Sequence, residues 1–216
     1  LEAIRKSQRK SKIKFIVTRH EQAAAFMAAT IGRITGKVGV ALSTLGPGAT
    51  NFMTSVAYAQ LGGFPLLVIT GQKPIKKSKQ GKFQIVDIVG MMKPVTKFST
   101  SITNGNDIAK IFSEAVSLAE AERPGAVHIE LPEDIASEIC DTKPLEAKKI
   151  ISKNADEKTI TNAIKEIEKA KHPLVILGAG ANRHSLQKEL KAFFNKTSIP
   201  FISTQMGKGA FDENSA

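Results

Sequence analysis

Apolar residues in the first part of the chain alternate between helical spacing and short continuous runs. An alanine-rich segment at 21–33 predicts a helix that ends at Gly36. Continuous apolar runs at 38–44 and 65–70 predict buried strands, and a β-rich run at 13–18 predicts a further strand. Since helices and apolar strands alternate, we expect an α/β fold with a doubly wound parallel sheet covered on both faces.

The alternation continues to the end of the chain and divides it into two regions. The further predicted elements are helices at 52–60, 107–122, 159–169 and 185–195, and strands at 126–131, 174–177 and 200–203. Residues 137–155 show no clear periodicity and predict a linker between an α/β domain at 1–136 and a second at 156–216. Two strands form too small a sheet to stand alone, and the chain begins without Met. We therefore expect a truncated second domain and a fragment of a longer protein.

The chain is basic, with 31 Lys and Arg residues against 20 Asp and Glu residues and a formal net charge of +11. A basic protein is a candidate for nucleic-acid binding. One Tyr and no Trp leave little aromatic surface on which bases could stack. We therefore interpret the charge as a lysine-rich solvated surface and expect no nucleic-acid partner.

Simple counts exclude several other classes of protein. No apolar run approaches the roughly 18–20 residues that a membrane helix needs, and no signal-peptide pattern opens the chain. The single cysteine, Cys140, excludes an internal disulfide framework. The four histidines do not share the spacing of metal ligands, so we expect no metal-binding residue. These features predict a cytoplasmic protein with no membrane partner.

The first candidate site is the segment 18–21, for which two interpretations compete. In a capping box, Thr18 would accept a hydrogen bond from the Glu21 N–H and the Glu21 side chain would reach back. Alternatively, Glu21 is an acid–base group, because the uncharged helix that follows would desolvate its carboxylate and raise its pKa.

Three loops that follow predicted strands are candidates for ligand binding. Residues 44–51 form a Gly/Pro turn where backbone could approach a ligand, or a tight connection in which Thr50 or Asn51 caps the next helix. Residues 71–87 form a long polar loop where α/β folds bind ligands, or a solvated surface loop. The turn at 178–183 lacks the third glycine of the dinucleotide fingerprint, so it is a weak nicotinamide site.

Seven short strings occur along the chain in a fixed order. They are Arg19-His20-Glu21-Gln22-Ala23-Ala24, Gly32-Arg33-Ile34-Thr35-Gly36-Lys37, Gly46-Pro47-Gly48-Ala49-Thr50-Asn51, Ile69-Thr70-Gly71-Gln72, Phe83-Gln84, Arg123-Pro124-Gly125 and Leu131-Pro132. In this order they resemble the acetolactate synthases, which are thiamine-diphosphate enzymes of the pyruvate-oxidase-like group. The resemblance implies that residues 1–136 form a pyrimidine-binding domain and that the central domain begins after the linker.

The resemblance also implies catalytic roles for Glu21 and Gln84. Glu21 would hydrogen-bond a ring nitrogen of the cofactor's aminopyrimidine and favour the imino tautomer that takes the proton of the thiazolium carbon. Gln84 would be a donor near the reacting carbonyl, with Phe83 beside it on the substrate side. The implied cofactor-binding residues are Glu21, Thr44, Gly46, Pro47, Asn51 and, at the position that meets flavin in flavin-containing members, Arg123.

The reaction implied by the resemblance joins two pyruvates into 2-acetolactate with loss of carbon dioxide, in a homodimer or homotetramer. Magnesium would be held by a diphosphate-binding domain with a Gly-Asp-Gly motif. No Gly-Asp-Gly occurs in this sequence, so we expect the chain alone to be inactive.

Some residues depart from the biosynthetic members of the family. Leu45, Ile85 and Glu133 stand where those members usually carry Ser, Glu and Lys. The departures leave the binding of FAD open, and with it a catabolic-type synthase without flavin. The alternatives are another thiamine-diphosphate-dependent decarboxylase, carboligase or oxidase that acts on a different 2-oxo acid, and, outside enzymes, a nucleotide-binding module.

Overall fold

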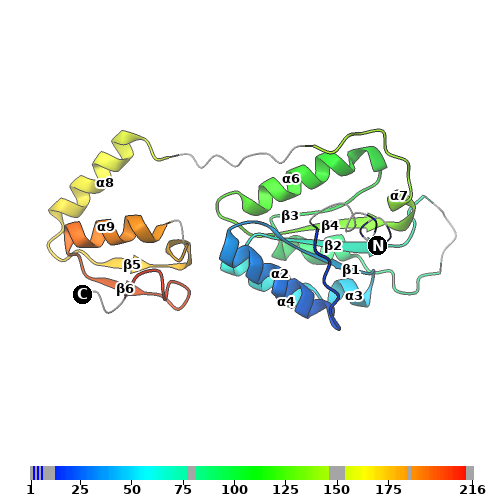
Figure 1. Ribbon diagram of the computed structural model, residues 1–216, viewed down its shortest axis with the longest axis horizontal. Helices are drawn as coiled ribbons and strands as arrows, with labels where there is room; N and C mark the ends of the chain where they lie inside the picture. The colour runs from blue at the N-terminus through cyan, green and yellow to red at the C-terminus, as the bar shows by residue number, and fades with distance from the viewer. Residues whose placement is uncertain are drawn as a thin grey trace.

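The computed structural model contains two parallel sheets with helices packed against them (Figure 1). It describes residues 2, 4, 6, 13–76, 81–145, 154–183 and 186–212. The larger sheet has the strand order β1-β2-β4-β3, and the smaller pairs β5 with β6. The prediction of an α/β fold with a parallel sheet is therefore confirmed.

The larger sheet is built from β1 (Gly39–Ser43), β2 (Leu66–Gln72), β3 (Phe98–Ser101) and β4 (Ala126–Pro132). All three pairings are parallel, so the carboxyl ends of these strands meet at one edge. Sequence analysis predicted β1, β2 and β4 from their apolar runs and missed β3. The sequence Phe-Ser-Thr-Ser of β3 carries one large apolar residue and gives no such signal.

Helices cover both faces of this sheet. On one face lie α2 (Glu21–Thr35) and α4 (Met53–Gly62), and on the other lies α6 (Ile108–Glu120), as Figure 1 shows. The short helices are α3 (Pro47–Thr50), α5 (Ile88–Met92) and α7 (Glu133–Ala136). The 3₁₀ turns are η1 (Lys93–Val95), η2 (Gly105–Asp107) and η3 (Ala179–Ala181).

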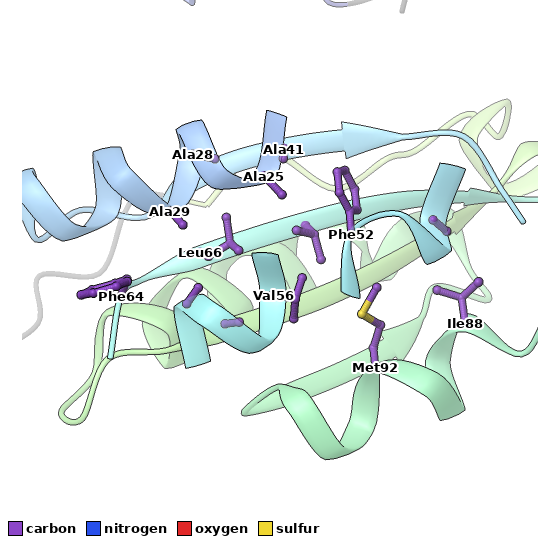
Figure 2. Close-up of a cluster of buried hydrophobic side chains, with 14 residues drawn as sticks. Ala25, Ala28, Ala29, Ala41, Phe52, Val56, Phe64, Leu66, Ile88 and Met92 are labelled. Atoms are coloured by element: carbon purple, nitrogen blue, oxygen red, sulfur yellow. The ribbon is translucent and has the colours of Figure 1, made fainter. Parts of the chain in front are cut away.

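Alternate side chains of each central strand enter two separate cores. Leu66 and Val68 of β2 pack with the residues of α2, α4 and α5, as in Figure 2. Leu67 of β2 packs on the opposite face with residues of α6. A strand buried on both faces reads as a continuous apolar run, which is why its position was visible in the sequence.

Helix α2 lies close to the sheet because small residues form the contact. Ala25, Ala28 and Ala29 are buried in the core between α2 and the strands (Figure 2). A Cβ added to Gly39 of β1 would lie 1.9 Å from the Ala28 carbonyl oxygen, so no side chain fits there. The helix ends at Gly36, which adopts the left-handed conformation with φ 67°.

The prediction of a strand at 13–18 is wrong. Residues 13–18 have no regular secondary structure. Ile13, Ile16 and Val17 are 58%, 58% and 81% exposed. A strand requires a hydrogen-bonded neighbour, and among the described residues β1, at the edge of the sheet, pairs only with β2. A β-rich composition therefore did not determine the pairing.

The second sheet consists of β5 (Val175–Leu177) and β6 (Phe201–Ser203), accompanied by α8 (Glu157–Lys169) and α9 (Gln187–Thr197). Its core is small and centres on Phe194. The ring centroid of Phe194 lies 4.9 Å from that of Phe201 and 4.8 Å from that of Phe211. Residues 139–145 of the predicted linker have no helix or strand, and residues 146–153 lie outside the described residues. The domain limits stay a prediction.

Within the described ranges, no helix has the length and apolar character that crossing a bilayer requires.

His128 links three strands inside the larger sheet. Its side chain is fully buried, with Nε2 2.9 Å from Thr70 Oγ1 and Nδ1 2.8 Å from Ser99 Oγ. Ser99 Oγ donates its proton to the Val89 carbonyl at 3.1 Å, so it accepts from His128 Nδ1–H. Nε2 then accepts from the Thr70 hydroxyl, which requires a neutral ring. Burial lowers the pKa of His128 to about 4.

We predict that His128 makes the stability of the fold depend on pH. The unfolded chain takes up a proton near the ordinary pKa of 6.5, whereas the folded chain does so near 4. The stabilisation is therefore complete above pH 6.5 and falls between 6.5 and 4, by roughly 3 kcal/mol. Urea denaturation of the wild type and of His128→Asn at several pH values measures the free energy of unfolding and its dependence on pH.

The matched control for this measurement is His172→Asn, because His172 is exposed in a turn. His172→Asn should keep the pH dependence of the wild type, and His128→Asn should lose most of it. Equal pH dependence in the wild type and His128→Asn would contradict the assignment of a neutral, buried imidazole.

Candidate functional site

The candidate site lies at the carboxyl ends of β1 and β2, where α2 and α3 begin. Glu21 is the first residue of α2, and Asn51 follows the last residue of α3. Glu21 Oε2 accepts a hydrogen bond of 3.0 Å from Asn51 Nδ2. Two residues from separate predicted motifs, 30 positions apart, are therefore in direct contact.

Helix α2 begins without a capping box. His20 is the N-cap, with φ −147° and ψ 136°, and its Nδ1 accepts from the Gln22 N–H at 3.2 Å. The Thr18 hydroxyl donates to the His20 carbonyl at 3.0 Å instead of accepting from Glu21. The capping-box interpretation is wrong, since Glu21 occupies the first position of the helix and its carboxylate contacts Asn51.

The expectation of a raised pKa for Glu21 is also wrong. The Asn51 amide is the main cause that holds the pKa of Glu21 below its ordinary value, with smaller contributions in the same direction from the backbone N–H and His20. Burial acts in the opposite direction and is weaker, because the side chain is only half-buried. The carboxylate is therefore ionised and has one oxygen engaged.

The turn at 46–51 packs closely against the Glu21 carboxylate. A Cβ added to Gly48 would lie 3.2 Å from Glu21 Oε1 and 2.7 Å from Thr44 Cγ2. Any side chain at position 48 would therefore push against the carboxylate. Pro47 opens α3 and is exposed, as is Thr44.

The proposed capping by Thr50 or Asn51 is not found. The Thr50 hydroxyl donates to the Pro47 carbonyl at 3.0 Å, and the Asn51 amide donates to Glu21. The N-cap of α4 is Phe52, which makes no side-chain cap hydrogen bond. Asn51 therefore contacts Glu21, Thr50 bonds within the turn, and neither side chain caps α4.

The loop 81–87 brings Gln84 next to Gly46. Gln84 has a positive φ of 63°, and Phe83 is 77% exposed. Gly46 has φ 55° and ψ −120°, and a Cβ there would lie 2.6 Å from the Gln84 carbonyl oxygen. Glycine at position 46 therefore permits the close approach of the two loops. Residues 77–80 of the predicted polar loop lie outside the described residues.

Gln72 and Glu130 form a hydrogen-bonded pair beneath this loop, and the patterns in the sequence did not point to Glu130. Glu130 of β4 is 6% exposed, and its Oε2 accepts from Gln72 Nε2 at 3.0 Å. Burial raises the pKa of Glu130 above its ordinary value, while hydrogen bonds from Ser101 and Gln72 act in the opposite direction. In the sequence of β4, the polar residues His128 and Glu130 stand two positions apart among apolar residues, and this pattern could have pointed to Glu130.

Arg123 does not join the other predicted residues. Its guanidinium donates to the Leu61 carbonyl at the amino end of the sheet, and it lines a cavity of about 750 Å³. The turn 121–125 is held by Lys97, whose Nζ donates to the carbonyls of Ala121 and Arg123 at 2.8 Å each. Sequence analysis gave no role to Lys97.

The cavity beside Arg123 lies between the two sheets. Arg33 and the turn 62–65 line it on one side, and Gly180 and Arg183 line it on the other. Arg183 makes a two-fold ion pair with Glu122, with N···O distances of 2.7 and 2.9 Å. The predicted turn at 178–183 therefore contributes to this second site.

Among the residues that the structure describes, no group of three or more His, Cys, Asp or Glu side chains could hold a metal ion. The site at Glu21 offers an ionised carboxylate and a neighbouring amide against a glycine turn, next to an exposed aromatic ring and a second amide. Such a set can hold the protonated nitrogen of a heteroaromatic ring and present a donor to a polar substrate.

Two regions of the chain are similar to families of known proteins. Residues 1–91 match the model of the thiamine pyrophosphate enzyme N-terminal TPP binding domain. Residues 160–216 match the model of the thiamine pyrophosphate enzyme central domain. The first matched segment contains β1 and β2 of the larger sheet, and the second contains both strands of the smaller sheet.

Curated relatives share sequence along almost the whole chain. The chain is 37% identical to the acetolactate synthase large subunit of Parasynechococcus marenigrum over 210 residues, which cover 94% of this chain and 34% of the relative. It is 39% identical to the probable acetolactate synthase large subunit of Methanococcus aeolicus, over 92% of this chain and 34% of the relative. It is 36% identical to the acetolactate synthase large subunit of Corynebacterium glutamicum, over 94% of this chain and 33% of the relative.

The chain spans about a third of the length of these relatives. The two domain models match it in the order N-terminal domain, then central domain, and five of the seven ordered strings lie within the first match. The chain belongs to the thiamine pyrophosphate enzyme family.

Proposed function

We propose that the chain is the pyrimidine-binding part of an acetolactate synthase, which joins two pyruvates into 2-acetolactate and carbon dioxide. The observation that carries the proposal is the contact of Glu21 with Asn51 beside Gly48, at the carboxyl ends of the parallel strands. The names of the similar proteins, all acetolactate synthases, support this choice of reaction. The alternatives within the family are a decarboxylase, another carboligase or an oxidase that acts on a different 2-oxo acid.

The residues around Glu21 fit the pyrimidine ring of thiamine diphosphate. Asn51 engages Oε2 of the carboxylate, and Oε1 lies beside Gly48, where a side chain would push against it. An ionised Oε1 would accept a hydrogen bond from a protonated ring nitrogen and stabilise the proton there. When bound, the cofactor supplies a thiazolium carbon that adds to a ketone and accepts the electrons released with carbon dioxide.

Gln84 and Phe83 would serve the substrate side of the same site. Both residues are exposed on the loop that touches Gly46, so their side chains are available to a ligand. The Gln84 amide is a neutral donor suited to the carbonyl or carboxylate of a 2-oxo acid. The Phe83 ring would exclude water beside it.

A flavin is a second proposed ligand, for the cavity that Arg123 lines. A Cβ added to Gly178 or Gly180 would meet no atom within 4 Å, so packing within the described chain does not require glycine there. Glycine at such positions lets a ligand approach the backbone. The guanidinium groups of Arg33 and Arg123 on the same cavity favour an anionic group such as a diphosphate, whereas the charge of Arg183 is compensated by Glu122. FAD fits this description, and reconstitution with FAD tests it by the absorbance of the bound flavin.

Magnesium, the assembly and the location of the protein are also proposals. We infer that magnesium and the diphosphate are held by another domain, which faces Glu21 across a homodimer interface, alone or within a homotetramer. An active monomer at working concentration, observed by analytical ultracentrifugation in assay buffer, would rule out this assembly.

The single cysteine, Cys140, agrees with a reducing compartment such as the cytoplasm.

An assay for acetolactate with pyruvate, thiamine diphosphate and magnesium tests the reaction, with and without FAD. Formation of acetolactate supports the synthase. Release of acetaldehyde or acetate in its place would favour the decarboxylase or oxidase alternative. No turnover of any 2-oxo acid by the assembled enzyme would leave the nucleotide-binding module as the better description.

We predict that Glu21→Gln in the assembled enzyme slows activation of the cofactor. A neutral amide cannot stabilise a protonated ring nitrogen, so the exchange of the thiazolium C2 proton should fall by about 10²–10⁴. Folding should survive, because Gln keeps the size and can still accept a hydrogen bond from Asn51. Quenched-flow NMR measures the exchange, and a melting curve measures the fold.

Glu157→Gln is the matched control, because Glu157 is likewise the first residue of a helix, α8, and is exposed. It should leave the exchange of the C2 proton unchanged. If Glu21→Gln also left the exchange unchanged, Glu21 would have no role in activation and the proposed function would lose its main support.

We further predict that the 216-residue chain binds thiamine diphosphate weakly by itself. The described residues offer no metal site for a diphosphate, so the pyrimidine contacts would act alone. Titration calorimetry with magnesium present should show a dissociation constant well above the micromolar range. Micromolar binding would contradict the assignment of the diphosphate to another domain.

A further inference from the structure

Gln72, the last residue of β2, connects the sheet to the loop that carries Phe83 and Gln84. Its Nε2 donates to Glu130 Oε2 at 3.0 Å and to the Val86 carbonyl at 3.3 Å. Its Oε1 accepts from the Lys73 N–H at 2.9 Å. The amide therefore uses both of its protons and its oxygen, and its orientation is determined.

The buried partner fixes the amide in place. Glu130 lies on β4, between β2 and β3, where it is paired with Thr70 of β2 and Ser101 of β3. Its carboxyl is almost completely buried and receives hydrogen bonds from Gln72 and Ser101. Removing a donor from a buried carboxyl costs free energy, so the pair resists rotation of the Gln72 side chain. The second proton of the amide is thereby directed at Val86.

Among the described residues, the ties of this loop to its surroundings lie mainly at its two ends, where the Val86 carbonyl also accepts from the Ile88 N–H at 2.9 Å. Residues 81–87 are all exposed, and the hydrogen bond from the Ile85 N–H to the Lys82 carbonyl, 3.0 Å long, lies within the loop. Lys73 Nζ donates to the Gly81 carbonyl at the start of the loop, and Gln72 holds the Val86 carbonyl at its end. Phe83 and Gln84 lie between these two points.

We propose that Gln72, held by Glu130, is a positioning residue that sets the place of Phe83 and Gln84 in the active site. The loop is anchored at Val86 by a contact from the rigid end of β2. Gln72 does not approach the Glu21–Asn51 pair through any of its hydrogen bonds. Its effect is therefore on the substrate side alone. The catalytic consequence rests on the proposed function, whereas the anchoring of the loop does not.

The test uses Gln72→Met in the assembled enzyme, because Met keeps the length of the side chain and removes both donors. Hydrogen exchange is measured for the amides of 82–87 without cofactor, and steady-state kinetics with pyruvate are measured with cofactor. We expect exchange in 82–87 to rise about tenfold or more at the Ile85 amide, which is hydrogen-bonded within the loop. We expect kcat/KM for pyruvate to fall about 10–100-fold, while exchange of the C2 proton stays within about twofold.

Two controls isolate the contact with Val86. Gln60→Met removes a similar amide, whose Oε1 accepts from the Ala126 N–H at 3.0 Å at the amino end of the sheet. Ser101→Ala removes the other donor to Glu130 without touching Val86. Both variants should leave exchange in 82–87 close to that of the wild type. Gln72→Asn, whose shorter side chain cannot reach both acceptors, replaces Gln72→Met if the latter does not fold.

Each outcome decides the inference. If Gln72→Met leaves amide exchange in 82–87 unchanged, the positioning role of Gln72 is overturned whatever the kinetics. If exchange becomes faster while kcat/KM stays unchanged, the role is also overturned, because catalysis would then not need the loop to be anchored. An equal loss of C2-proton exchange in Gln72→Met would show a general disturbance of the site and overturn it as well. The proposed function is judged separately by Glu21→Gln, so the two can fail independently.

Discussion

The candidate site depends on the common direction of β1, β2 and β4. Because the strands are parallel, their carboxyl ends lie together, and the turn after β1 meets the loop after β2. Gly46 and Gln84 touch there, and Asn51 reaches Glu21 at the start of α2. If one of these strands ran the other way, these residues would lie at opposite edges of the sheet.

The character of the sheet changes along its length. Toward the amino ends, the face beneath α4 is apolar, with Leu66, Val68 and Ala126 in the core. Toward the carboxyl ends, the same face carries Thr70, His128 and Glu130, which are buried and hydrogen-bonded. The apolar half supplies most of the driving force for folding, and the polar half directs particular groups at the loops above it.

Local patterns predicted the elements well and the long-range contacts poorly. Continuous apolar runs marked β2 and β4, whereas β3 is polar and pairs only because β4 offers it an edge. The segment 13–18 has a strand-like composition and joins neither sheet. The pKa of Glu21 depends on Asn51, and the packing of Gly46 depends on Gln84. Each of these contacts joins residues about 30 or more positions apart, which spacing alone cannot reveal.

The ion pair between Glu122 and Arg183 has a consequence for the cavity that it borders. Both side chains are substantially exposed, at 69% and 38%, and exposed pairs of this kind contribute about 1 kcal/mol or less. The attachment of the second sheet at this point is therefore weak and sensitive to ionic strength. A ligand that contacts both walls of the cavity would add to the attachment by mass action, so occupancy and the rigidity of the joint between the two sheets are thermodynamically linked.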